Sequence, residues 1–226
     1  MTSYRQYCPV AKTHEILGGR WTILIVRELL AGQDTFNAIA RGLPGIPRSI
    51  LSERLRYLER KGVVAREAVA TRRQRYELTE AGRGLKPIVH AMGGWGARWL
   101  LEQPHEDELD PGLLLWRMQN RLNTAALPAG RVVIHFEFRI GPKGRFWFVV
   151  DDARGSVCLT DPGFDVDLFV TADLSAFYEV WLGRRSLRSA VDTGAIRIEG
   201  SPSLERSFGE WFLWSPMARF VRPQPE

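Results

Sequence analysis

The sequence has little cysteine and no long run of apolar residues. Its two cysteines, Cys8 and Cys158, give no disulfide framework, no CxxC motif and no metal-ligand spacing, so a reducing cytoplasm is the expected setting. No stretch approaches the roughly 20 consecutive apolar residues of a membrane helix. The first fifteen residues lack the basic start and apolar run of a secretory signal. We therefore expect no membrane among the partners.

Motifs of common enzyme classes are also missing. The four histidines, His14, His90, His105 and His135, are scattered without ligand spacing. There is no GxSxG, no phosphate-cradling glycine loop and no HExxH. The paired carboxylates at 151–152 fall in an expected turn and are interpreted as solvated. The expectation is a protein that is not an enzyme, with no catalytic residue, metal or cofactor, although a site assembled from distant residues stays open at this point.

Charge is distributed unevenly along the 226 residues. Residues 1–101 hold 17 Lys and Arg against 8 Asp and Glu, a net charge of +9, whereas the remainder holds 14 against 18, a net charge of −4. The polar, proline-containing stretch 102–112 predicts a linker. We expect two domains, 1–101 and 113–226, and the basic first half suits a polyanion, whose phosphates release counterions on binding.

Hydrophobic periodicity predicts an order of elements in residues 1–101. Helices are expected over 10–17, 20–30, 36–43 and 47–61, and the period then changes to that of a β-hairpin over 63–78. A last helix is expected from Thr79 to about Leu101, with an interruption at Gly93-Gly94 and Gly96. The order helix–helix–helix–hairpin–helix is that of a winged helix-turn-helix, in which the helix before the hairpin enters the major groove of DNA.

The helix predicted over 47–61 carries the candidate DNA contacts. Leu51, Leu55 and Leu58 share one face, and the opposite face is polar and basic. Residues near the start of such a helix usually reach the bases, so Arg48, Ser49 and Ser52 are the first candidates. Arg56 suits guanine edges or phosphate, and Arg60 suits the backbone. At the hairpin tip, Arg72, Arg73 and Arg75 suit phosphate or a narrow minor groove; a merely solubilising loop is the other interpretation.

Several motifs, in order, resemble the HxlR family of bacterial regulators, relatives of the MarR type. They are Cys8-Pro9-Val10, LGGRWTILI at 17–25, LSERLRYLERKG at 51–62 and YELTEAG at 76–82. The resemblance covers about residues 5–101. It implies a homodimer on a near-palindromic operator, with residues 8–17 and 85–101 at the dimer interface. Some members carry a redox- or electrophile-sensing cysteine where this chain has Cys8; an unreactive interface cysteine is the alternative.

The second half predicts an α+β domain. Alternating apolar residues predict strands over 131–140, 145–150, 156–160, 165–172 and 195–200. Helices are expected over 113–125, 174–181 and 187–191 and around Leu204–Phe212. The segments 165–174, 180–183, Leu187 and 194–200 are similar to sterol carrier protein-like domains, whose fold covers an apolar cavity for lipids or other hydrophobic molecules.

Aromatic residues of the second half are the candidates for a ligand site: Phe136, Phe138, Phe148, Phe177, Trp181 and Trp211. Filling of the core is the other interpretation of these side chains. The resulting hypothesis is a cytoplasmic, nucleoid-associated transcription regulator that binds double-stranded DNA as a homodimer and responds to a small hydrophobic ligand. Two alternatives stay open: a regulator whose C-terminal domain is only structural, and a lipid-carrier-type protein with an accessory basic domain.

Overall fold

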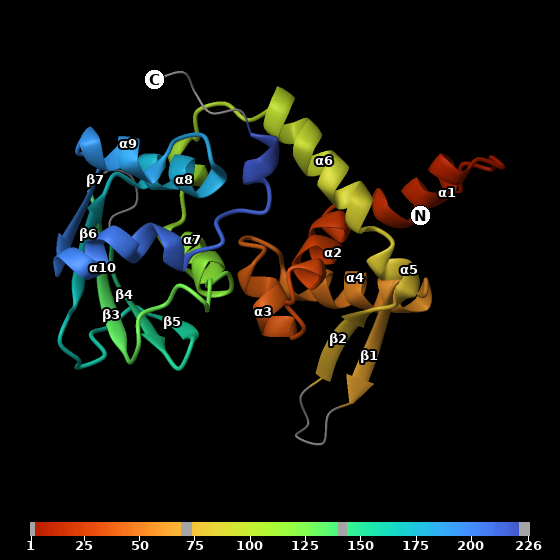
Figure 1. Ribbon diagram of the computed structural model, residues 1–226. Coiled ribbons are helices and arrows are strands. Elements are labelled where there is room, and N and C mark those ends of the chain that lie inside the picture. The colour runs from red at the N-terminus through yellow and green to blue at the C-terminus, as the bar shows by residue number, and fades with distance from the viewer. Residues whose placement is uncertain (1–2, 69–73, 140–143, 222–226) are drawn as a thin grey trace. The chain divides into compact units, whose positions relative to one another are not determined.

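The chain divides into two units, Met1–Met92 and Gly93–Glu226, whose helices and strands are labelled in Figure 1. Each unit has its own hydrophobic core. The computed structural model describes residues 3–68, 74–139 and 144–221. The division between the units falls inside a helix, α6, so that this helix contributes residues to both. The domain limits at 101 and 113 stay predictions.

The N-terminal unit follows the predicted winged helix-turn-helix order. Its elements are α1 (Pro9–Leu17), α2 (Thr22–Leu30), α3 (Phe36–Arg41), α4 (Arg48–Arg60), β1 (Val64–Ala68), β2 (Gln74–Leu78), α5 (Glu80–Arg83) and the first half of α6 (Lys86–Trp99). Its core is formed mainly by Ile25, Val26, Ile39, Leu51, Leu55 and Leu58. Leu51, Leu55 and Leu58, which the sequence places on one face of a helix, therefore meet inside the unit.

Local signals set the ends of these helices. The Thr35 side chain accepts a hydrogen bond from Ala38 N (3.3 Å) and so caps α3, and Thr79 does the same for α5 through Gly82 N (3.1 Å). Gly62, just after α4, has a φ of +69°, which favours glycine and ends the helix before β1.

The sequence predicts a helix from Thr79 to about Leu101 with an interruption at the glycines, and the predicted position of that interruption is wrong. The helix ends at Arg83 and restarts at Lys86, and α6 then runs through Gly93, Gly94 and Gly96 without interruption. Two of these glycines make room for close packing: a Cβ on Gly93 would lie 2.3 Å from Met217 Sδ, and one on Gly94 would lie 3.1 Å from the Phe220 ring. The helix thus continues through glycine, a residue of poor helix propensity, where these side chains pack against it.

The C-terminal unit is a five-stranded sheet with helices. Its strands are β3 (Val132–Phe138), β4 (Gly144–Asp151), β5 (Arg154–Cys158), β6 (Leu168–Ala172) and β7 (Ile196–Gly200), in the order β5-β4-β3-β6-β7. Among the strand pairs formed by the described residues of this sheet, β3–β6 alone is parallel. Its helices are α7 (Pro111–Gln119), α8 (Leu174–Leu182), α9 (Leu187–Asp192) and α10 (Pro202–Ser207).

Some boundaries of this unit differ from prediction. The helix expected over 113–125 spans Pro111–Gln119, because Asp110 caps it by accepting from Leu113 N and Pro111 fits its first turn. The last predicted helix ends at Ser207 and continues as a 3₁₀ turn, Phe208–Trp211. The strand expected over 156–160 begins at Arg154, since Asp152 and Ala153, both with positive φ, form a two-residue hairpin turn.

Within the described ranges, no helix is long and apolar enough to cross a membrane.

Candidate nucleic-acid interface

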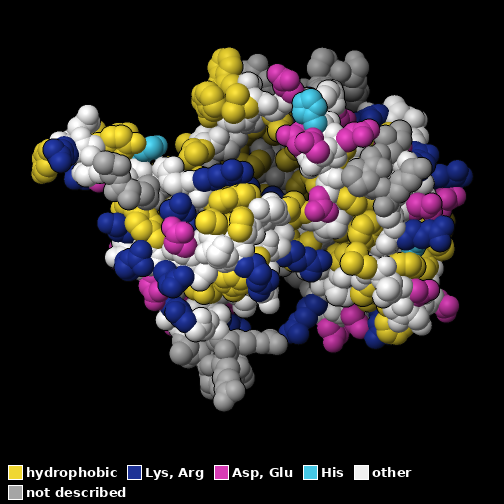
Figure 2. Space-filling model, turned by 180° about the vertical axis from the view of Figure 1, so that it is seen from behind, with side chains coloured by type: hydrophobic (Ala, Val, Ile, Leu, Met, Phe, Trp, Pro, Cys, Tyr) yellow, Lys and Arg dark blue, Asp and Glu magenta, His cyan; other side chains and the backbone are white. Residues whose placement is uncertain are grey.

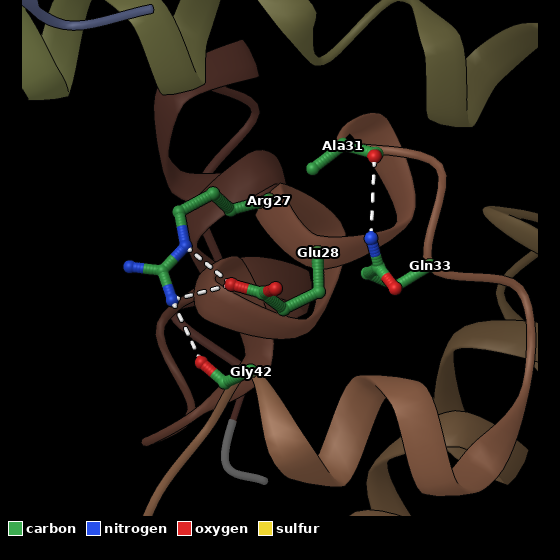
Figure 3. Close-up of polar contacts among 5 residues, drawn as sticks. All are labelled: Arg27, Glu28, Ala31, Gln33 and Gly42. Atoms are coloured by element: carbon green, nitrogen blue, oxygen red, sulfur yellow. Dashed lines mark hydrogen bonds and ion pairs between the residues drawn. The ribbon is translucent and has the colours of Figure 1, made fainter. Parts of the chain in front are cut away.

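A buried carboxylate, that of Glu28, and its neighbour Arg27 connect α2 to the end of α3. Glu28 of α2 is only 3% exposed, and its Oε1 accepts hydrogen bonds from Arg27 Nε (2.9 Å) and Nη2 (2.6 Å) (Figure 3). Arg27 Nη2 also lies 3.4 Å from Gly42 O, to which it donates. Because Gly42 directly follows α3 on the way to α4, these contacts tie α2 to the turn of the helix-turn-helix. Nearby, Gln33 Nε2 donates to Ala31 O (3.5 Å) in the loop after α2.

Helix α4 has the two faces that its sequence predicts. Leu51, Leu55 and Leu58 are buried. Four candidate residues on its other faces are exposed, namely Arg48, Ser49, Arg56 and Arg60, and Ser52 is half-buried. The structure therefore brings the five candidates of α4 onto one accessible helix, while their role as DNA contacts stays a prediction.

The Arg48 side chain is positioned by two contacts with α3. Its Nη2 donates to Asn37 Oδ1 of α3 (2.9 Å), and its guanidinium carbon lies 5.0 Å from the centroid of the Phe36 ring. Sequence analysis missed Asn37 and Phe36, because no periodicity connects α3 to the start of α4. Further along α4, Arg56 Nε donates to Ser52 O (3.3 Å).

Arg75 of β2 is less available than its place in the sequence indicates. Its Nε lies 3.4 Å from Asp34 Oδ2, and Glu67 is its partner across the β1–β2 ladder. The pairing extends to the start of α3, since Tyr76 N donates to Asp34 O (2.7 Å) and Thr35 forms a bridge with Arg75. Arg75 therefore has a carboxylate partner, Asp34, in an exposed ion pair of modest strength.

The other two hairpin candidates, Arg72 and Arg73, lie outside the described residues. On β1, Arg66 is exposed opposite Tyr76 and adds a basic side chain to the hairpin that sequence analysis did not single out. Figure 2 shows several Lys and Arg side chains on the face of the N-terminal unit that it presents.

The six aromatic candidates of the C-terminal unit are buried and pack on one another or on neighbouring rings. Phe136 lies against Phe138 (6.2 Å between centroids) and Phe177 (5.7 Å), and Trp211 against Phe208 (5.7 Å). Phe148 packs on Phe212 (5.8 Å), and Trp181 on Trp214 (6.5 Å). In this structure the six side chains form part of the core, and whether any of them also contacts a ligand stays a prediction.

Cys8 is partly exposed and precedes the first turn of α1. Its carbonyl accepts from Lys12 N (3.0 Å), as in an ordinary first helical turn. Nothing in these contacts distinguishes a sensing thiol from an unreactive one, so its redox role stays a prediction. Among the described residues, no group of three or more His, Cys, Asp or Glu side chains is arranged to hold a metal ion.

Shifted pKa values occur away from α4 and the hairpin. Burial lowers the pKa of His135 on β3 and raises the pKa of Tyr178 on α8 to about 12. The pKa of Glu15 on α1 is lowered by hydrogen bonds from Tyr4 N and the Ser3 hydroxyl. None of these three groups belongs to α4 or to the hairpin.

Comparison with known proteins assigns both halves of the chain. Residues 16–104 match the HxlR-like helix-turn-helix family, and residues 119–212 match the SCP-2 sterol transfer family. The "Uncharacterized HTH-type transcriptional regulator YvaP" of Bacillus subtilis (strain 168) is 39% identical over 98 residues, which are 42% of this chain and 91% of that protein. The regulator sll1512 of Synechocystis is 35% identical over 107 residues, 46% of this chain and 79% of that protein.

Among solved structures, the reduced form of the transcriptional regulator YodB from B. subtilis is 32% identical, with a TM-score of 0.37, over 42% of this chain and 96% of that one. The predicted fold class, a helix-turn-helix regulator joined to an α+β domain of the sterol carrier type, is confirmed by the two family matches. The chain belongs to the HxlR-like helix-turn-helix family of transcriptional regulators, and it carries a domain of the SCP-2 sterol transfer family.

Proposed function

We propose that the protein binds double-stranded DNA at a near-palindromic operator as a homodimer, with α4 in the major groove. One observation carries the proposal: α4 buries Leu51, Leu55 and Leu58 and leaves Arg48, Ser49, Arg56 and Arg60 exposed. Short hydroxyl side chains next to guanidinium groups can reach base edges and phosphates together. Arg60, farthest along the helix, suits the phosphate backbone.

Arg48 is the contact that we expect to matter most. A guanidinium has five N–H donors, and the bond to Asn37 uses one of them. The remaining donors are presented in a geometry that Asn37 and the Phe36 ring already fix. Such preorganisation lowers the entropy lost when the side chain binds a phosphate or a guanine.

Exposed apolar residues on α1 and α6 support the homodimer. Ile88, Met92, Trp95 and Trp99 recur at helical spacing along α6 and are 39%, 53%, 58% and 62% exposed. Val10 of α1 is 76% exposed. Large apolar side chains gathered on one helix face are typical of protein interfaces. Both helices lie in the segments that the family resemblance implies for dimerisation.

For the C-terminal domain we propose a small hydrophobic ligand that tunes DNA affinity. The match to the SCP-2 sterol transfer family supports this proposal. The packing of Phe136, Phe138 and Phe177 on one another favours a second candidate, in which the domain is only structural. The first candidate requires these rings to separate on binding, and a thermal shift with apolar ligands distinguishes the two.

We further propose that the protein acts by binding rather than by catalysis, in the cytoplasm and at the nucleoid. A lipid-carrier role with an accessory basic domain would leave the exposed face of α4 without a use. Specific DNA binding therefore separates that alternative from a regulator.

The test is a footprint of the purified protein on the promoters of its own and adjacent genes. The Arg48→Ala/Ser52→Ala variant should lose specific binding, and Arg72→Ala/Arg73→Ala should weaken binding to all sequences and flatten its salt dependence. The control is Arg188→Ala/Arg206→Ala, which removes two exposed arginines of the C-terminal unit and should bind like the parent. Parental binding by both interface variants would contradict the proposed docking.

A further inference from the structure

The C-terminal unit contains a pocket that the functions above leave unused. It has a volume of about 260 Å³ and lies between the segment after α6 and helix α8. Leu100, Leu101, Pro104 and Leu182 supply apolar walls, and Tyr178 supplies an aromatic one. None of the six aromatic candidates for the SCP-2 ligand lines it.

Hydrogen bonds to α8 and its end hold the chain that forms one wall. Arg184 Nη1 donates to Glu102 O (2.5 Å), at the start of the segment 102–110. At its end, Tyr178 Oη donates to Asp110 O (2.9 Å) and accepts from Asp110 N (3.3 Å). Between them, His105 N donates to Glu108 Oε2 (3.0 Å). Because hydrogen bonds hold this segment at both ends, the pocket is preformed, and ligand binding costs little entropy for ordering the segment.

The walls leave apolar surface uncovered. Leu100 is 65% exposed and Leu101 is 39% exposed. Covering such side chains with an apolar group is favourable in proportion to the area removed from water. The pocket therefore suits a ligand with a hydrophobic part.

The charges around the pocket favour a positive charge on the polar part of the ligand. Glu102, Glu108 and Glu179 line it together with a single arginine, Arg184, which already donates to a backbone carbonyl. Figure 2 shows several acidic side chains on the face of the C-terminal unit that it presents. The Tyr178 phenol is neutral at physiological pH, and burial raises its pKa further, to about 12; the face of a neutral aromatic ring attracts cations.

We propose that this pocket binds a small hydrophobic cation, of the quaternary-ammonium or protonated-amine class. Leucine walls would hold the apolar part, and Glu102, Glu179 and the Tyr178 ring would face the positive charge. Tyr178 and Leu182 pack against the core of the C-terminal unit from the pocket side, but none of the six aromatic candidates lines the pocket. The proposal does not rest on DNA binding.

The experiment titrates the full-length chain with benzyltrimethylammonium and measures the heat of binding. Benzylsulfonate keeps the ring and reverses the charge, and tetramethylammonium keeps the charge without the ring. We expect one benzyltrimethylammonium per chain, bound at least about tenfold more tightly than either comparison ion, since each loses one of the two attractions. Equal affinity for benzyltrimethylammonium and benzylsulfonate, or no saturable binding, would overturn the proposal.

Variants locate the site. Glu102→Gln and Glu179→Gln should each weaken benzyltrimethylammonium binding about threefold, as expected for partly exposed charges. The matched control, Glu137→Gln on the sheet, removes an exposed carboxylate that does not line the pocket and should bind like the parent. Parental affinity in both Glu102→Gln and Glu179→Gln would contradict the assignment.

Leu100 and Leu101 directly follow α6, so a second copy of the chain is the competing occupant. Binding that appears only in a monomeric variant, Met92→Asp, would assign the pocket to the dimer interface and overturn the proposal. DNA is absent from these titrations, so their failure leaves the proposed DNA binding untouched, and a failed footprint leaves the pocket untouched.

Discussion

The carboxylate of Glu28 lies where a side chain on Gly42 would begin: a Cβ added to Gly42 would stand 2.1 Å from Glu28 Oε2. Helix α2 and the end of α3 can approach this closely only because residue 42 has no side chain. The same contact brings Gly42 O to Arg27. The geometry of the helix-turn-helix therefore depends on a glycine whose φ of −72° would be open to any residue.

Gly42→Ala should destabilise the protein by about 1–3 kcal/mol, the usual cost of forcing extra atoms into a packed site. The new methyl group must displace a buried carboxylate rather than the end of a flexible surface chain. The free energy of unfolding in urea measures the effect. The control is Gly96→Ala in α6, where a Cβ would meet no atom within 4 Å; it should be neutral or stabilising by up to about 1 kcal/mol. An unchanged stability of Gly42→Ala would refute the described contact.

Asn37 should act on DNA through Arg48. Asn37→Ala removes the acceptor that holds the Arg48 guanidinium, so DNA affinity should fall by about two- to fivefold, the worth of one modest hydrogen bond. In an Arg48→Ala background the same change should have almost no effect. A double-mutant cycle measured by gel shift gives the coupling directly. Additive losses would show that Asn37 affects DNA binding independently of Arg48 and would contradict this prediction.

Sequence patterns predicted most of the N-terminal unit because its helices are set by local signals. The spacing of Leu51, Leu55 and Leu58 identified the buried face of α4, and Gly62 marked its end. The ion pair between Arg75 and Asp34 and the bond between Arg48 and Asn37 connect residues on different elements. No periodicity reports such pairs, so the availability of each arginine could not be judged from the sequence.

The glycines of α6 were misinterpreted for a related reason. Gly93 and Gly94 were expected to interrupt a helix, but Met217 and Phe220 pack against them there. Composition likewise could not separate a filled aromatic core from the lining of a cavity, because both need the same residues. The pocket beside α8 was missed because it joins a segment expected to be a plain linker to a helix about 70 residues away in the chain.

A charge introduced among the exposed apolar residues of α6 should dissociate the proposed homodimer into monomers. Met92, 53% exposed, would face the partner chain in the proposed homodimer, so Met92→Asp would bury an unpaired carboxylate there. We expect a monomer by sedimentation at concentrations where the parent is a dimer, with a matching loss of operator affinity. Leu159→Asp is the control, since Leu159 is 71% exposed on the C-terminal unit and lies on neither α1 nor α6. A dimeric Met92→Asp variant would exclude this face as the interface.

His135 should make stability depend on pH. It lies on β3 between Trp147 (5.0 Å between ring centroids) and Phe169 (5.7 Å). Burial against these rings lowers its pKa in the folded state; Arg145 lowers it further, and Glu137 and Asp161 oppose the shift. The unfolded chain therefore takes up this proton first as pH falls below the ordinary histidine value of about 6.5. The associated stability is fully present above that pH and is lost as pH falls toward the lowered pKa of the folded state.

His135→Gln removes the titration but keeps a polar side chain of similar reach. Urea unfolding at about pH 7.5 and about pH 5.5 should show a larger loss of stability for the parent than for His135→Gln, because the other three histidines are common to both. Glu137→Gln in the parent removes a carboxylate that favours the protonated ring, so it should deepen the loss. Equal losses in the parent and His135→Gln would mean that water reaches the ring on this face as freely as it does in the unfolded chain.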